Sequence, residues 1–391
     1  MSAPPDAGRP IRVLFLINSL ATGGAERQLA LTVAHLDRVR FDPVVCCLFS
    51  GGPFLEEVEQ AGVEVSELRL QKSLRAALPG VRRAVDEIRP DIVHTAMFEA
   101  NVAGRLAARR ANVPVISHAT NLYESPARYA ETAVPRWKLL AARSLERLSA
   151  RRSRVHVVAV ARAVAASAAG YLRVPPSRVS LVRRGFDFTA LEQSAAREPD
   201  APAWPKDASP RILAIGRLAP QKGHRFLLEA IPAIRERHAR AHLCIAGAGP
   251  LESDLRSRVE ALGLTDAVSL LGVRRDVPAL LARADLFVLP SLWEGAAGAL
   301  VEAMGLGVPV AITDHEPLRE IAGNHAAYFP PADPGAIAGA VGRLAGDPNG
   351  ARRTAAEGIA PVREAHDIAR NTRAMEAVYE AVLANRTPEG D

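Results

Sequence analysis

Two carboxylates beside the start of a predicted helix are the residues most suggestive of chemistry. Glu294 lies in a small-residue turn after an apolar strand, and Glu302 follows after seven intervening residues, within the segment 290–304 (PSLWEGAAGALVEAM). Ionised carboxylates only accept hydrogen bonds, so two of them facing a ligand suit the hydroxyls of a sugar or ribose. The N–H groups at the helix start favour an anion or hydroxyl oxygens. The alternative is a Glu stabilised by the helix dipole and a second Glu on a solvated face.

Two cations occupy a second predicted loop between a strand and a helix. Arg217 and Lys222 lie in the segment 216–223 (GRLAPQKG). An Arg fork and a Lys point charge together match a diphosphate. The alternative is a pair of exposed loop cations with no ligand.

Glycines follow several predicted strands. Gly23 and Gly24 follow the first strand, and Gly247 and Gly249 follow the second strand of the C-terminal half. Such glycines let backbone N–H groups approach a phosphate or sugar. Tight turns or close strand–helix packing explain them equally well. The N-terminal loop lacks both GxGxxG and the P-loop Lys-Ser/Thr, which argues against dehydrogenases and NTPases.

Further polar candidates lie in the N-terminal half. Arg184 precedes a Gly-Phe-Asp turn, and His118 lies in the segment 114–121 (PVISHATN) at a strand end. Arg184 could meet an anion, and His118 could contact a sugar. A turn closed by Asp and a structural histidine are the respective alternatives.

Apolar runs of strand length alternate with helical patterns in both halves of the chain. Expected strands are 11–17, 44–49, 63–68, 92–94, 113–117 and 155–160, then 212–215, 243–246, 268–270, 286–289 and 310–312. Expected helices are 25–36, 74–88, 101–110 and 137–149, then 226–236, 251–262, 277–282, 298–305 and 369–384. This rhythm predicts an α/β protein with two Rossmann-like, doubly wound, mostly parallel domains facing a central cleft.

The length of 391 residues also favours two domains over one core. We expect an N-terminal domain over 1–195, a Pro-, Ala- and Asp-rich linker over 196–210, and a C-terminal domain over 211–368. The segment 369–391 is expected to pack as a helix against the N-terminal domain.

Composition excludes several classes of protein. No apolar run reaches 18 residues, and the start, Met1 to Pro10, has no signal-peptide pattern. The three cysteines, Cys46, Cys47 and Cys244, have no metal-ligand spacing and suit buried thiols in a cytosolic protein. Aromatic residues make up only 5% of the chain, with no stacking platform for nucleic acid.

The net charge of +6 is unevenly distributed, with +9 in residues 1–195 and −3 in the remainder. The densest basic stretch is Arg136 to Arg154, which contains Arg136, Lys138, Arg143, Arg147, Arg151, Arg152 and Arg154. Leu139, Leu140, Leu145 and Leu148 interleave with these cations at helical spacing. Such a helix suits an anionic membrane surface, although an ordinary surface helix has the same pattern.

Taken together, these motifs resemble the retaining, GT-B-fold glycosyltransferases of family four (glycosyl transferases group 1). The resemblance runs from Val13 to Tyr379. It rests on the segments 23–26 (GGAE), 216–217 (GR) with 222–223 (KG), 247–250 (GAGP), 276–278 (DVP) and 294–304 (EGAAGALVEAM). Each motif is weak alone, but five in this order at strand–helix junctions are specific.

The resemblance implies that the N-terminal domain, 1–195, is the acceptor-side domain and that the C-terminal domain, 211–368, binds the nucleotide sugar. It also implies a role for each matching position. Arg217 and Lys222 hold the donor diphosphate in place of a metal ion, and Glu294 contacts the donor sugar as the third catalytic residue. Glu302 accepts hydrogen bonds from the ribose. The other implied donor-binding residues are Gly23, Gly24, Gly216, Gly247, Gly249, Arg274, Gly295, Ala296, Ala297 and Gly298, with the base near Gly272, Val273 and Arg274. Candidate contacts to acceptor or sugar are His118, Thr120, Asn121 and Arg184.

The implied activity is metal-independent transfer of a hexosyl unit, with retention, from a UDP- or GDP-sugar to a lipid-linked or glycan acceptor. No other cofactor is implied, and the enzyme is expected in the cytoplasm or peripherally on the inner face of the membrane. A non-catalytic nucleotide-sugar binder and a nucleotide-sugar epimerase on the same fold are the alternatives.

Two positions depart from the family pattern. Ala296 and Ala297 stand where the family has Phe or Leu followed by Gly or Pro, which leaves the sugar open. The family's cleft histidine aligns with Thr120. His118 lies two residues earlier on the same strand face and is the candidate substitute.

Overall fold

The structure, a computed structural model, describes residues 9–21, 23–131, 134–201 and 203–385. The start of the chain up to residue 8, Thr22 of the first loop, Pro202 of the predicted linker and the final residues 386–391 lie outside the described residues. Contacts divide the described residues into two compact units. Unit 1 contains 9–124, 134–185 and 368–385, and unit 2 contains 125–131 and 186–367.

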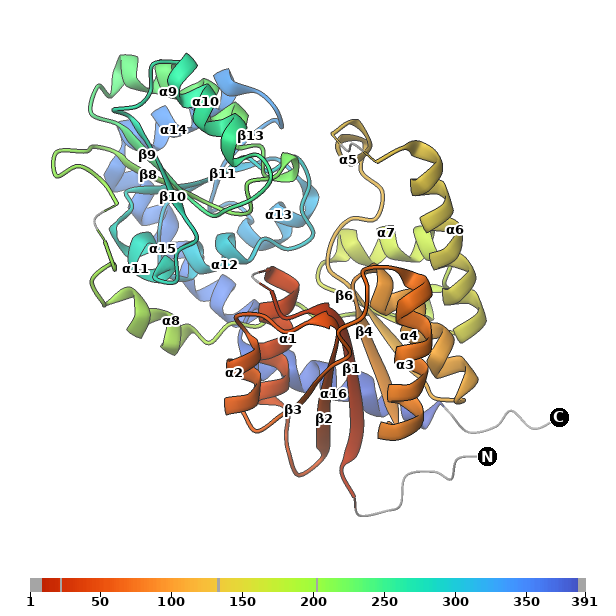
Figure 1. Cartoon of the computed structure of the whole chain (residues 1–391). Helices are drawn as coiled ribbons and strands as arrows, with labels where there is room; N and C mark the ends of the chain where they lie inside the picture. Colours follow the sequence, from red (N-terminus) through yellow and green to blue (C-terminus); the bar gives the residue numbers. More distant parts are fainter. Residues whose placement is uncertain (1–8, 22, 132–133, 202, 386–391) are drawn as a thin grey trace. The chain divides into compact units, whose positions relative to one another are not determined.

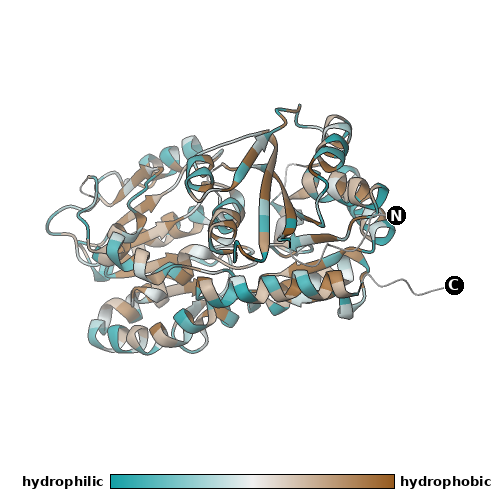
Figure 2. Cartoon of the chain, turned by 90° about the horizontal axis from the view of Figure 1, so that it is seen from below, coloured by the Kyte–Doolittle hydropathy of each residue, from teal (hydrophilic) through white to brown (hydrophobic). Residues whose placement is uncertain are grey.

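Unit 1 is built on a parallel sheet in the order β3-β2-β1-β4-β5-β6-β7 (Figure 1). Its strands are β1 Ile11–Ser19, β2 Phe41–Ser50, β3 Glu64–Glu67, β4 Ile92–Ala96, β5 Val115–Ala119, β6 His156–Ala159 and β7 Val179–Leu181. The centre of β1 is fully or almost fully buried from Val13 to Ile17. This burial on both faces explains why the central strands read as continuous apolar runs (Figure 2).

Helices cover both faces of this sheet. They are α1 Gly24–His35, α2 Leu55–Gln60, α3 Leu74–Ile88, α4 Phe98–Arg110, α6 Arg136–Ser153, α7 Arg162–Leu172 and α16 Ile368–Ala384, with the short 3₁₀ turn η1 Pro176–Arg178. Helix α1 contacts both α2 and α16, whereas α4 packs against α3 and α6. Unit 1 therefore has the two helical layers of a doubly wound fold.

Unit 2 repeats this plan with the sheet order β10-β9-β8-β11-β12-β13, again parallel. Its strands are β8 Arg211–Ile215, β9 His242–Ala246, β10 Val268–Gly272, β11 Leu286–Leu289, β12 Val310–Thr313 and β13 Ala327–Phe329. Its helices are α5 Pro126–Ala130, α8 Phe188–Ala195, η2 Pro220–Lys222, α9 His224–Arg237, α10 Glu252–Ala261, α11 Val277–Arg283, α12 Gly298–Gly305, α13 Glu316–Ala322, α14 Pro334–Gly346 and α15 Pro348–Ala365. The prediction of two parallel, Rossmann-like α/β sheets is confirmed.

The units differ from the expected domain limits at two places. Unit 1 ends at Gly185 rather than at residue 195, because Phe186, Phe188 and Leu191 are buried in an apolar core of unit 2. Residues 125–131 also group with unit 2, where Glu131 forms an ion pair with Arg225 at 2.7 Å.

Helix α16 completes the core of unit 1 although it comes from the far end of the chain. Tyr379 is fully buried and packs against Phe15 and Phe41. Its hydroxyl lies 2.7 Å from Nδ1 of His94 on β4. The His94 ring stacks on His118 of β5, with ring centroids 5.5 Å apart. The last helix thus holds a buried polar cluster against the sheet.

Burial also shifts the titration of both histidines. It lowers the pKa of His94 well below its usual value, with a smaller contribution from His118. Burial, and then the charge of Arg184, lowers the pKa of His118 to about 4. Both imidazoles are therefore neutral in the folded protein at pH 7.

We predict that Tyr379→Phe lowers the free energy of unfolding by about 1–3 kcal/mol, because it leaves the buried His94 Nδ1 without this partner. Tyr328→Phe is the matched control, since its hydroxyl donates to the Gly323 carbonyl at an exposed site. The control should change stability by less than about 0.5 kcal/mol. Urea unfolding followed by circular dichroism measures both, and equal effects would contradict the assignment.

We also predict that stability falls as the pH drops from about 6.5 towards 4. In this window an unfolded histidine binds a proton while folded His118 does not, so acid favours the unfolded state. His118→Gln should reduce the slope of unfolding free energy against pH by up to about 1.4 kcal/mol per pH unit. Urea titrations across this range test it, and an unchanged slope would show that His118 titrates normally.

Candidate functional site

The candidate site of unit 2 lies where its strand order reverses. Ligands of doubly wound sheets bind outside the carboxyl ends of the strands at such a point. Here β8 and β11 are neighbours in the sheet, and the loops that follow them are 216–223 and 290–297. Arg217, Lys222 and Glu294, predicted from separate motifs, therefore lie at one edge of the sheet.

Lys222 and Glu294 form an ion pair across these loops. Glu294 Oε1 also accepts a hydrogen bond of 2.7 Å from the Ser291 hydroxyl. The Glu294 side chain is only 6% exposed, and that of Lys222 is 20% exposed. Both contacts use Oε1, and Glu294 Oε2 has no hydrogen-bond partner within the described part of the chain. This second oxygen can accept hydrogen bonds from hydroxyl groups.

Backbone contacts hold the same two loops together. Leu292 N donates to the Gln221 carbonyl at 2.7 Å, and Gln221 Nε2 donates to the Trp293 carbonyl at 3.0 Å. Gly223 has a φ of +63°, and a Cβ there would lie 2.0 Å from the Pro290 carbonyl oxygen. A side chain at position 223 is excluded both by conformation and by contact, so glycine is what allows Lys222 to reach Glu294.

The other strand-end glycines serve loop packing. A Cβ on Gly247 would lie 2.0 Å from the Gly216 carbonyl oxygen, and one on Gly249 would lie 2.4 Å from the Leu218 carbonyl oxygen. Close packing thus accounts for Gly247 and Gly249 without a ligand, whereas a Cβ on Gly216 would lie 3.1 Å from Cδ of Lys222. It also fixes the loop that carries Arg217, whose side chain is exposed and has no ion-pair partner among the described residues.

The turn before α12 is buried. Residues 291–297, which include Gly295, are buried, and Ala296 and Ala297 are each 3% exposed. Helix α12 begins at Gly298 with no side-chain cap, and its Glu302 is 3% exposed. The second predicted carboxylate is thus on the buried side of the helix, which argues against the alternative of a solvated Glu.

Arg274 has a local ion-pair partner. Its Nε and Nη2 donate to the two carboxylate oxygens of Asp276 at 2.7 and 2.5 Å, and Nη2 also donates to the Ala201 carbonyl. The guanidinium lowers the pKa of Asp276 to about 2. Val273 is 59% exposed. It is therefore more accessible than Arg274 in the turn that we expect near the nucleotide base.

Two histidines that the sequence patterns did not single out lie beside the ion pair. His224, the first residue of α9, is 3% exposed, and burial, then the charge of Lys222, lowers its pKa to about 4. His315 Nε2 lies 3.1 Å from the Ser291 carbonyl oxygen. Their positions in the sequence could have identified both histidines. His224 directly follows the Lys-Gly pair, and His315 follows the end of β12, which is the neighbour of β11.

Unit 1 has a second group of predicted residues at the carboxyl end of β1. A Cβ on Gly24 would lie 2.4 Å from Arg184 Nη1, and one on Gly23 would lie 2.2 Å from Glu26 Oε2. The Asn371 side chain on α16 donates to the Arg184 carbonyl at 3.0 Å. Gly24 therefore makes room for the buried Arg184 guanidinium, and Gly23 makes room for the Glu26 carboxylate.

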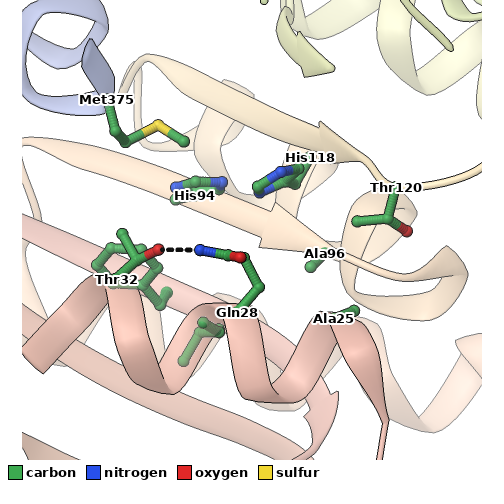
Figure 3. Close-up of a pocket in the computed structure, with 10 residues that line it drawn as sticks. Ala25, Gln28, Thr32, His94, Ala96, His118, Thr120 and Met375 are labelled. Atoms are coloured by element: carbon green, nitrogen blue, oxygen red, sulfur yellow. Dashed lines mark hydrogen bonds between the residues drawn. The ribbon is translucent and has the colours of Figure 1, made fainter. Parts of the chain in front are cut away.

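A pocket lies next to this turn (Figure 3). Its lining includes Ala25, Gln28 and Thr32 from α1, His94, Ala96, His118 and Thr120 from the strand ends, and Met375 from α16. Figure 3 shows the two histidine rings side by side across from Gln28, whose Nε2 donates to Thr32 Oγ1 at 3.2 Å. His118 Nε2 has no hydrogen-bond partner in the described chain, and Thr120 lies at the pocket edge.

Asn121 is arranged differently, because its Oδ1 accepts a hydrogen bond of 2.8 Å from Leu122 N within the turn. The predicted residues therefore form two groups, one in each unit.

The described residues contain neither a metal-binding cluster nor a membrane-spanning helix. No group of three or more His, Cys, Asp or Glu side chains is arranged to hold a metal ion in the described residues. No described helix has the length and apolar character needed to cross a membrane.

Comparisons with known proteins are consistent with this architecture. The family model described as Glycosyltransferase Family 4 matches residues 22–190, and the model described as Glycosyl transferases group 1 matches residues 209–347. The crystal structure of HepE from Anabaena in complex with UDP-glucose superposes with a TM-score of 0.78 at 20% identity, covering 95% of this chain and 100% of that one.

Two curated relatives show the level of sequence similarity. The UDP-Gal:alpha-D-GlcNAc-diphosphoundecaprenol alpha-1,3-galactosyltransferase of Escherichia coli is 32% identical over 57% of this chain and 58% of its own length. The putative colanic acid biosynthesis glycosyltransferase WcaL of Salmonella typhimurium is 30% identical over 42% of this chain and 41% of its own length. The chain thus spans about half the length of the curated relatives it matches.

The two family models lie one on each parallel sheet and between them account for most of the chain, in the order that the strand-end motifs indicated. The chain therefore belongs to the group 1 (family four) glycosyltransferases of the GT-B fold.

Proposed function

We propose that this protein transfers a hexosyl unit from a UDP- or GDP-sugar to a lipid-linked or glycan acceptor, with retention of configuration and without a metal ion. The observation that carries the proposal is the Lys222–Glu294 pair at the β8–β11 switch point, held by Ser291. The names of the relatives support the substrate class, since HepE was solved with UDP-glucose and the E. coli relative is a UDP-Gal galactosyltransferase.

In this proposal the donor diphosphate lies between the exposed Arg217 and Lys222. Breaking the glycosidic bond leaves negative charge on the nucleoside diphosphate, and fixed cations stabilise that charge as it develops. The Lys222 side chain is partly exposed, so its ammonium group can move from the Glu294 carboxylate to a phosphate oxygen of the donor. Glu294 Oε2 and its neighbour Oε1 would then accept hydrogen bonds from sugar hydroxyls, and Glu302 from the ribose.

Retention without a protein nucleophile implies attack on the face from which the leaving group departs. The acceptor hydroxyl forms the new bond to the anomeric carbon while the phosphate oxygen leaves and takes the acceptor proton. The protein contributes positioning and charge rather than a covalent intermediate. The residues of this chain therefore need only hold the donor and present the acceptor.

We assign the acceptor side to unit 1. The pocket beside Gly24 offers the neutral His118, whose Nε2 can accept a hydrogen bond from a hydroxyl group. The buried Arg184 lies against Gly24, next to the pocket. Thr120 at the pocket edge, and Asn121 after it, are the neighbouring polar residues. A lipid-linked acceptor would place the enzyme in the cytoplasm at the inner face of a membrane.

We predict that UDP or GDP, or their sugars, raises the melting temperature of the protein, and that Arg217→Ala abolishes most of the increase. A ligand at 100 times its Kd stabilises the folded state by about 2.7 kcal/mol. Arg240→Ala is the matched control, because Arg240 is likewise exposed in unit 2 but precedes β9, at the opposite edge of the sheet. The screen includes UDP, GDP, ADP, their sugars and the free nucleosides. A shift equally large with the nucleosides would contradict a diphosphate site.

We predict that Lys222→Ala and Glu294→Ala each reduce glycosyl transfer more than tenfold, since one removes charge stabilisation (about 1.4 kcal/mol per tenfold) and the other a sugar contact. Lys206→Ala and Glu260→Ala replace exposed residues of the same unit and should retain wild-type rates.

The assay follows release of nucleoside diphosphate with the donor found by the screen and a set of lipid-linked and glycan acceptors. Wild-type rates in both site variants would refute the site assignment. Nucleotide-sugar binding with no turnover on any acceptor would indicate a binding protein. Interconversion of the nucleotide sugar without acceptor, seen by NMR, would indicate an epimerase.

A further inference from the structure

Helix α6 has an outward face that the proposed transfer reaction does not use. Trp137, Leu140, Leu145 and Leu148 are 67%, 61%, 42% and 46% exposed. They lie at helical spacing along the same side of an 18-residue helix in unit 1. Leu139 is only partly exposed, so it is not part of this face. Exposed leucines are individually common, but four large apolar side chains along one helix form a patch.

The cations of the same helix separate into two sets. Arg143 forms an ion pair with Glu124 at 2.6 Å, and Arg147 Nε donates to the Tyr171 carbonyl at 2.6 Å. Both guanidiniums lie within 6 Å of the Tyr171 ring centroid. These two residues therefore fix α6 to unit 1 rather than facing a partner.

The remaining cations are exposed alongside the apolar side chains. They are Arg136, Lys138, Arg151, Arg152 and Arg154, and none has an ion-pair partner among the described residues. The only acidic residue of α6, Glu146, is 5% exposed and lies on the opposite side. The outward face thus combines apolar side chains with charged groups that are all basic.

We propose that this outward face of α6, defined by Trp137, Leu140, Leu145, Leu148 and the five exposed cations, binds the surface of an anionic phospholipid bilayer. An interfacial helix lies in the membrane plane with apolar side chains below the headgroups and cations among them, and Trp favours that depth. Each cation near such a surface strengthens binding by about fivefold. Because α6 is already folded and anchored through Tyr171, binding requires no ordering of the helix.

The charge pattern favours lipid over a protein partner. The cores of protein interfaces are depleted of charged residues, whereas this face alternates five cations with Trp and Leu. The helix lies on the surface rather than crossing it, since five cations on one face are incompatible with the bilayer interior.

The test is vesicle flotation of the full chain at low and high salt. The vesicles contain phosphatidylcholine alone or phosphatidylcholine mixed with phosphatidylglycerol. We expect binding to the anionic vesicles that weakens with salt, because headgroup attraction is screened. The double variants Arg151→Glu/Arg152→Glu and Trp137→Ser/Leu140→Ser should each weaken it by at least about tenfold. All of these positions are exposed, so the melting temperature should be unchanged, and this is checked for each variant.

The matched controls are Arg352→Glu/Arg353→Glu on α15, with the same change of charge, and Val39→Ser, which removes another exposed apolar side chain. Both should bind vesicles like the wild type. The proposal is wrong if the wild type binds no vesicles, if it binds neutral vesicles equally, or if the α6 variants bind unchanged. Self-association that is lost in Trp137→Ser/Leu140→Ser, without vesicle binding, would instead identify a second copy as the partner. The flotation assay contains no nucleotide sugar. A failure to bind vesicles would therefore not contradict the proposed donor site.

Discussion

The meeting of the loops after β8 and β11 is the constraint on which the donor side of this protein depends. Lys222 and Glu294 are 72 positions apart in sequence, yet they form an ion pair because their strands are neighbours at the switch point. The contact requires that the backbone at Gly223 approach the Pro290 carbonyl closely. A single residue without a Cβ therefore allows a cation and a carboxylate from separate motifs to act at one place.

Unit 1 likewise depends on a contact between segments that are far apart in sequence, which its last helix provides. The chain returns from unit 2 at Ile368, and α16 covers the sheet beside β1 and β4. Glu376 accepts a hydrogen bond of 2.8 Å from Asp37 N and pairs with Arg40, which ties the helix to the start of β2. Tyr379 then reaches His94 in the core. The pocket beside His118 exists only because this late helix supplies its far wall through Met375.

The local periodicity of apolar residues predicted much of the fold. It failed to predict elements in which that periodicity is weak. Helix 298–305 was predicted with the limits that α12 has, because apolar residues recur there at helical spacing. Helices α14 and α15 were not predicted, since α14 (PGAIAGAVGRLAG) consists largely of Gly and Ala and lacks a clear polar face. The Asp-Pro pairs at 333–334 and 347–348 were usable signals, because each Asp side chain caps a helix that begins with Pro.

The sequence by itself determined the alternation of strands and helices, and hence which residues lie at strand ends, because these follow from local backbone periodicity. It also determined that cations and carboxylates recur at these ends. Only the tertiary structure decided which of them meet, and it paired Lys222 with Glu294 but Arg274 with Asp276. On α6 it likewise turned Arg143 and Arg147 towards Tyr171 and left five cations exposed. Side-chain pairing depends on which elements become neighbours, and that choice is made by packing across the whole unit rather than by spacing along the chain.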